Sequence, residues 1–144
     1  MANVREFEDN INSYLQEIIT ENAPYIADMN ATEQLRDRGM NALGIAIADY
    51  APYAASTIEI KKAKGQPYDR VTLQDTGEFH ASFYVDARSD EFEIMASDWK
   101  ADDLARSYGK DIFGLTDANK REVTWDYVYP ELLNKAKNVI YAGV

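Results

Sequence analysis

The residues best suited to do chemistry lie near the middle of the chain, at Asp75, Glu78 and His80. A carboxylate beside an imidazole could bind a divalent metal ion or transfer a proton. His80 is the only histidine among 144 residues, however, so a metal site would need at least two more carboxylates from elsewhere. No ligand spacing such as HExxH is present to supply them. We therefore interpret His80 as an exposed strand residue and predict no metal site.

A second pattern is the triplet Asp75, Thr76 and Gly77, which in aspartic proteases carries the catalytic aspartate. In those enzymes two carboxylates share one proton. This chain has a single copy without the apolar flanks of that motif, so the chemistry would require a symmetric dimer. A dimeric, carboxylate-based hydrolase is the enzyme alternative, but the pattern favours a turn, and we predict no catalytic residue.

Other familiar sites have no local support in the sequence. Asp98, Asp102 and Asp103 lie close together, but acidic residues in the first turn of a helix are explained by the helix dipole. The motifs GxxxxGK[ST], GxGxxG and GxSxG are absent, which argues against nucleotide binding and serine hydrolysis. We predict no cofactor.

Charge and composition restrict the partners. Fifteen Lys and Arg against 25 Asp and Glu give a formal net charge of −10, which repels phosphate backbones and anionic membranes. A basic stretch at Lys61, Lys62 and Lys64 acts against that average, although such short runs are usually solvated. Ten tyrosines suit contact surfaces as well as a core. We expect binding to neither nucleic acid nor membrane, and synthesis in a cytoplasm, because no segment resembles a signal peptide or a transmembrane span.

Helical periodicity predicts the N-terminal half of the chain. Apolar residues spaced for one helix face predict an amphipathic helix over 4–20, which Pro24 ends. Asn30, followed three residues later by Glu33, predicts a capping box that opens a second helix to about Tyr50.

The middle of the chain predicts a connector followed by a hairpin. Proline and glycine signals make 51–72 an irregular connector with one short helix over 58–64. The turn at Gly77 leads into alternating residues from Phe79 to Asp86, which pair with a second alternating run over 91–97.

The last third predicts two helices. A short helix over 102–108 ends at Gly109, and a final helix runs over 118–140 from a cap at Thr116 or Asp117. Pro130 should kink or divide this helix near Tyr129. Its predicted buried face consists of Trp125, Val128, Leu132, Leu133, Ala136, Val139 and Ile140.

Together these elements predict an α+β fold in a single domain. We expect a helical segment over 1–50, the connector over 51–72, and the hairpin with the C-terminal helix over 73–144. A small antiparallel sheet with a central hairpin would be covered by the long helices, because a two-stranded sheet is not stable alone.

Two short patterns mark the chain after the connector. In the first, an apolar residue, an acidic residue, Thr and Gly precede a predicted strand, and a Ser follows a few positions later: Leu73, Asp75, Thr76, Gly77 and Ser82. In the second, a Tyr and a Gly precede a short apolar segment that leads into the last predicted helix: Tyr108, Gly109, Phe113, Gly114 and Leu115. Through these two signatures the chain resembles, over about 56–140, the virion-morphogenesis and tail-completion (neck) proteins of tailed bacteriophages.

The resemblance implies a structural virion protein without catalytic residues. Such proteins act in head-tail joining or tail completion, commonly as a ring of identical subunits that contacts other neck, portal or tail proteins. Assembly would take place in the bacterial host cytoplasm, and the final location would be the virion. The alternative is a small acidic binding module that uses an exposed hairpin edge outside any virion.

Overall fold

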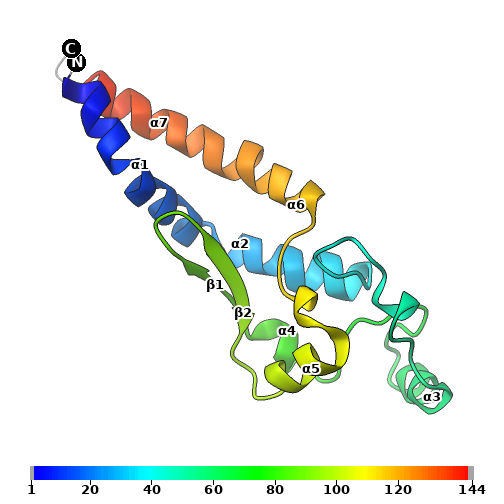
Figure 1. Ribbon diagram of the computed structural model, residues 1–144. Helices are drawn as coiled ribbons and strands as arrows, with labels where there is room; N and C mark the ends of the chain where they lie inside the picture. The colour runs from blue at the N-terminus through cyan, green and yellow to red at the C-terminus, as the bar shows by residue number, and fades with distance from the viewer. Residues whose placement is uncertain (1, 143–144) are drawn as a thin grey trace.

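The first and last helices run side by side and antiparallel, as the computed structural model shows for residues 2–142 (Figure 1). They are α1 (Ala2–Glu21) and α7 (Tyr129–Ile140). Asn3 Nδ2 donates to the carbonyl of Ile140 at 3.1 Å at one end of the pair. At the other end Asn22 Nδ2 donates to Glu131 Oε1 at 3.3 Å. We call α1 and α7 the arm, and the rest of the molecule the body.

The C-terminal helix is continuous with two short segments that precede α7. These are α6 (Asp117–Glu122) and the π-helical η4 (Val123–Val128). Thr116 caps the start, since its hydroxyl accepts the Asn119 backbone N–H at 3.3 Å. The predicted helix over 118–140 is thus confirmed. The irregularity predicted near Tyr129 is a change from π- to α-helix just before Pro130, and the chain stays helical throughout.

The second helix differs from its prediction at both ends. It begins as α2 (Ala23–Asp28) and continues directly into the π-helical η1 (Met29–Asp37). Pro24 opens this helix, because a proline in the first turn removes an N–H that has no partner there. The capping role predicted for Asn30 was therefore wrong, since Asn30 lies inside the helix. The predicted end at Tyr50 was also wrong.

Gly39 is where the second helix gives way to irregular chain. Its φ is +62°, and a Cβ at this position would stand 2.8 Å from the Cβ of Arg70, so the site requires glycine. An isolated bridge between Met40 and Ala46 and a 3-10 turn, η2 (Ile47–Asp49), follow.

The predicted connector contains one helix, α3 (Ala55–Ala63), which starts three residues before its predicted position. It projects at the end of the molecule opposite the arm (Figure 1).

The hairpin is confirmed, but its first strand starts later than predicted. The antiparallel strands are β1 (Phe83–Ala87) and β2 (Phe92–Ala96), with Val85 opposite Ile94. A helical turn, α4 (Glu78–Ala81), occupies the segment predicted to begin the strand. Gly77, at φ +94°, turns the chain into this helix rather than into a strand. The fold class is α+β, with N-terminal helices, one antiparallel hairpin and a C-terminal helix, as predicted.

The short helix predicted over 102–108 is also confirmed. It is α5 (Ala101–Tyr108), it ends at Gly109 with φ +89°, and a 3-10 turn, η3 (Lys110–Ile112), follows.

The core lies in the body, where the second helix meets the hairpin and the segment after α5. The largest fully buried apolar side chains are Ile26, Leu35, Ile47, Ile112 and Val71 in the body, together with Ile18 near the end of α1. No residue of α7 is buried, and Trp125 is 62% exposed. The buried face predicted for the C-terminal helix is therefore confirmed only in part: α1 packs along it and leaves Val128, Leu132, Ala136, Val139 and Ile140 half-buried, whereas Trp125 and Leu133 are exposed.

Candidate functional site

The two sequence signatures meet in space at a cluster of three aromatic rings. The Phe79 and Phe83 rings lie 5.0 Å apart, and Phe113 lies 5.3 Å from Phe83 and 6.1 Å from Phe79. Phe79 and Phe83 are four residues apart across the end of α4, so the turn at Gly77 sets the position of both. Segments about thirty residues apart in sequence thus form one part of the core.

The first signature makes a structured turn. Leu73 is buried and has a φ of +59°, the only positive value outside glycine among residues 2–142. The Thr76 hydroxyl accepts the Glu78 N–H at 3.4 Å. Asp75 is exposed and receives a hydrogen bond from Lys64 Nζ at 2.8 Å. That bond and the Lys64 charge hold the pKa of the Asp75 carboxyl below its usual range. The arrangement is that of an ion pair and a turn, not of two carboxylates sharing a proton.

The prediction that His80 is an exposed strand residue was wrong. His80 lies half-buried in α4, and its Nε2 is 2.8 Å from the carbonyl oxygen of Thr72. Burial lowers the pKa of the imidazole, and the hydrogen bond to Thr72 opposes this shift only in part. Within residues 2–142 no three His, Asp or Glu side chains gather closely enough to hold a metal ion.

Three further signature residues, Ser82, Tyr108 and Gly109, connect neighbouring segments through hydrogen bonds or a turn. The Ser82 hydroxyl donates to the Phe79 carbonyl at 2.8 Å and accepts the Asp98 N–H at 3.1 Å, which ties α4 to the chain that leaves β2. The carbonyl of Tyr108 accepts the Tyr50 hydroxyl at 2.8 Å, and Gly109 then turns the chain away from α5.

Gly114 and its neighbours are held by two buried amides from the second helix, Asn30 and Gln34. Asn30 Nδ2 donates to the Ile112 carbonyl at 2.9 Å, and its Oδ1 accepts the Gly114 N–H at 2.7 Å. Gln34 Nε2 donates to the Gly114 carbonyl at 2.8 Å. We call Asn30 and Gln34 the amide clamp.

The amide clamp also holds the start of the C-terminal helix. Gln34 Oε1 accepts the Thr116 N–H at 3.0 Å and the Asn119 Nδ2–H at 2.8 Å. Both clamp side chains are fully buried, so their hydrogen bonds replace water completely. Sequence reasoning missed the clamp. The available signal was a pair of amide side chains four residues apart on the apolar side of a helix. A polar residue on that side is buried and therefore needs hydrogen-bond partners from another segment.

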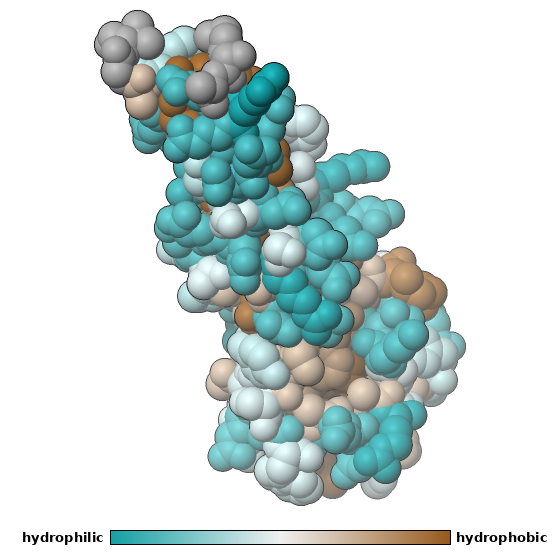
Figure 2. All heavy atoms as spheres, turned by 60° about the vertical axis from the view of Figure 1, so that its left-hand side comes forward, coloured by the Kyte–Doolittle hydropathy of each residue, from teal (hydrophilic) through white to brown (hydrophobic). Residues whose placement is uncertain are grey.

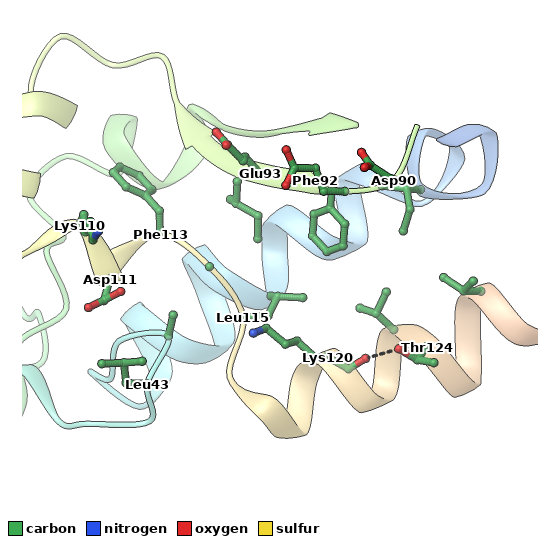
Figure 3. Close-up of a pocket in the computed structure, with 17 residues that line it drawn as sticks. Leu43, Asp90, Phe92, Glu93, Lys110, Asp111, Phe113, Leu115, Lys120 and Thr124 are labelled. Carbon is green, nitrogen blue, oxygen red and sulfur yellow. Dashed lines mark hydrogen bonds between the residues drawn. The ribbon is translucent and has the colours of Figure 1, made fainter. Parts of the chain in front are cut away.

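A groove of about 820 Å³ lies between β2 and the start of the C-terminal helix (Figure 3). Its floor is apolar, and Phe92 points across it toward the helix while Lys120 reaches in from the opposite side. Four acidic and two basic residues line it: Asp90, Glu91, Glu93 and Asp111, with Lys110 and Lys120. We call this the acidic groove. Phe113, Gly114 and Leu115 of the second signature form part of its lining.

One wall of the acidic groove is an open sheet edge. The sheet has only two strands, and β1 packs against α1 and α2. The register, with Ser97 N–H bonded to the Ser82 carbonyl, turns the backbone groups of Phe92, Ile94 and Ala96 away from β1. Among residues 2–142 no other segment pairs with this edge. An unpaired edge is a template for another chain.

A second uncovered surface runs along the C-terminal helix. Trp125, Tyr129 and Leu133 follow each other at intervals of four residues and are 62%, 49% and 39% exposed. The Trp125 and Tyr129 rings are 5.5 Å apart. We call these three residues the rod stripe. Elsewhere, on the face shown in Figure 2, hydrophobic residues gather at the surface of the wide end of the molecule, while the arm is mostly hydrophilic.

The chain matches no protein-family model, no curated protein and no solved structure. None of the helices within residues 2–142 combines the length and the apolar character that a membrane crossing requires.

Proposed function

We propose that this chain is a non-enzymatic structural protein of a tailed phage or prophage. In this proposal it acts in head-tail joining or tail completion, as one subunit of an oligomeric neck or tail assembly. Its partners are further copies of itself and other neck, portal or tail proteins, and its final location is the virion.

The observation that carries the proposal is the exposed apolar stripe on the C-terminal helix. The rod stripe exposes three large side chains, and α7 buries none of its residues. Contiguous apolar surface of this kind is typical of interaction sites, and tyrosine and tryptophan are enriched in them. The resemblance adds support, because its two signatures belong to one packed region around Phe79, Phe83 and Phe113.

The second candidate function is a small acidic binding module that is not part of a virion. The open edge of β2 favours it, since an extended peptide could add a third strand there. The neighbouring genes distinguish the two functions: portal, capsid and tail genes beside this one would favour the role in the virion over the binding module.

Purified particles provide the direct test. We expect the protein to co-purify with virions in a fixed ratio to the portal protein, and deletion of its gene to leave heads and tails unjoined or tails incomplete. Complementation with the wild-type gene should restore infectious particles. Absence of the protein from particles, together with full infectivity of the deletion strain, would overturn the proposal.

A further inference from the structure

Strand β2 has backbone groups that no other part of the chain satisfies. The N–H and C=O groups of Phe92 and Ile94 point away from β1, and no hydrogen bond within residues 2–142 uses them. Ile94 is only 6% exposed, so water has little access to its two groups. Buried backbone groups without a partner are rare in folded proteins. The open edge is therefore suited to a partner that supplies backbone donors and acceptors.

The acidic groove provides the space for such a partner. Phe92 to Ile94 of β2 lie on one side of it, and the helix from Lys120 to Val128 lies on the other (Figure 3). Leu115 and Val123 contribute apolar surface to its lining. A third strand beside β2 would thus have apolar surface under one of its faces. Because side chains alternate along a strand, every second residue of that strand would be apolar.

The outer face of the hairpin has an excess of negative charge. One guanidinium, that of Arg88, is shared by three carboxylates, at 3.4 Å from Asp86, 3.2 Å from Glu91 and 3.8 Å from Glu93. Glu93 makes the longest of these contacts, and it is exposed on the strand that has the open edge. Opposite charges at neighbouring positions of two strands stabilise a sheet. A basic side chain beside Glu93 would therefore favour binding of an added strand.

We propose that an extended segment of a second neck or tail protein adds a third strand to the hairpin at the open edge of β2. The backbone of the segment bonds to Phe92 and Ile94. Its apolar side chains point into the acidic groove, and a Lys or Arg on its other face lies beside Glu93. Strand addition is a recurring mode of recognition, in which the backbone provides affinity and alternate side chains provide specificity. The source of the segment rests on the proposed function, whereas its chemistry follows from the edge and the groove.

A second copy of β2 fits this edge less well than such a segment. Two β2 edges paired antiparallel about Ile94 would place each Glu93 opposite Met95, which carries no charge, and β2 (Phe92–Ala96) contains no basic residue. The pairing would also bring together two hairpin ends with the same excess of negative charge. The charges of the hairpin therefore favour a different, basic strand.

A synthetic heptapeptide with blocked ends provides the test. Its sequence, Val-Thr-Val-Lys-Val-Thr-Val, has apolar residues on one face and a central Lys on the other. In NMR spectra of the isotope-labelled protein, we expect the peptide to shift the amide signals of Phe92 and Ile94. At saturation it should slow their hydrogen exchange at least about tenfold. The amides of Glu93 and Met95, which already bond to β1, should change much less.

The matched control is the same peptide with N-methyl groups on its two inner Val residues. Their amides would face β2, because they lie on the same side of the added strand as the groove-facing side chains. The control keeps the charge and side chains of the peptide but loses two backbone donors. It should bind at least about tenfold more weakly. Equal binding of the two peptides would overturn strand addition.

Charge variants test the pairing at Glu93. Glu93→Lys should weaken binding of the peptide by about two- to fivefold, the range for an exposed ion pair. Replacing the Lys of the peptide by Glu should restore the affinity for that variant. Glu8→Lys, at an exposed position of α1, makes the same change in net charge and should bind the original peptide as the wild type does. Equal losses in the two variants would contradict a basic residue beside Glu93.

Two further outcomes would overturn the inference. One is the lack of any binding at about 1 mM peptide. The other is protection of the Phe92 and Ile94 amides that rises with the concentration of the protein alone, because a second copy would then occupy the edge. The proposed function has a separate readout in the composition of virions and the infectivity of the deletion strain. A protein that enters particles but binds no peptide would lose this site and keep its role in the virion.

Discussion

The body and the arm of this protein are held together in different ways. In the body, the two amide-clamp side chains are fully buried, and each makes hydrogen bonds at both ends of its amide group. In the arm, no residue of α7 is fully buried: its apolar residues Leu132, Ala136, Val139 and Ile140 are half-buried, and the Lys135–Glu17 ion pair with α1 is partly exposed. The body therefore specifies its own structure, whereas the arm leaves surface that its own chain does not cover.

The contacts that hold the arm are individually weak. Lys135 Nζ lies 3.2 Å from Glu17 Oε2 and 5.6 Å from the centre of the Tyr14 ring. Exposed ion pairs contribute about 0–1 kcal/mol, less than a well-made buried contact. We infer that the arm opens more readily than the body, which hydrogen exchange of α7 amides against those of η1 can measure.

The largest effect is expected from breaking the amide clamp. Gln34→Ala leaves the Gly114 carbonyl and the Thr116 N–H buried without their partners. The free energy of unfolding should fall by about 3 kcal/mol or more, because each unsatisfied buried group costs about 1–3 kcal/mol. Urea unfolding measures the change. The control is Gln16→Ala, whose amide donates to Ala87 at the surface and whose loss should matter little. An equal fall in the free energy of unfolding in the two variants would show that the buried amide clamp stabilises the fold no more than a surface amide does.

A smaller effect in the body is expected from His80 as pH falls. Burial makes the pKa of folded His80 lower than its ordinary value of about 6.5, so protonation favours the unfolded chain. The stability from neutral His80 is complete above that ordinary value and is lost as pH falls toward the lower folded pKa. Unfolding of wild type and His80→Gln should therefore be compared from about pH 8 to pH 5. Wild type should lose more stability, and parallel curves would contradict the prediction.

The smallest effect on stability is expected at the rod stripe, which begins in η4 and continues into the arm helix α7. Trp125→Ala should change the free energy of unfolding by about 0.5 kcal/mol or less, because the side chain is mostly exposed. Incorporation into particles should nevertheless fall, since tryptophan side chains often dominate binding energy. Asp126→Ala, an exposed neighbour, is the matched control for both measurements. A large loss of stability would mean that the rod stripe belongs to the core.

The sequence predicted correctly those helices whose ends are marked by a capping residue or a glycine. Thr116 caps the final helix, and Gly109 ends the short helix before it, as predicted. The strand at Phe79 was misread because Phe79 and Phe83 fit both an alternating strand and one helix face. The positive φ of Gly77, which turns the chain into a helix, distinguishes the two structures.

The candidate site was harder to predict because its parts come together only through the fold. Asn30 and Glu33 have the spacing of a capping box, yet Asn30 bonds to a segment that lies 82 residues away. Likewise the apolar stripe of the C-terminal helix was correct as a pattern, but a pattern cannot say how much of it another element covers: α1 leaves Trp125 and Leu133 exposed. The acidic groove has residues from five separate stretches and no sequence motif.

The amide clamp also constrains the order of events during synthesis. Its hydrogen bonds join residues that are 80 to 85 positions apart. Asn30 and Gln34 can form these bonds only after Ile112 to Asn119 have left the ribosome, which at about 5–20 residues per second follows their own synthesis by several seconds. During that interval the second helix is a nascent segment with two unpaired amides on an apolar side, and its final packing is a late event in folding.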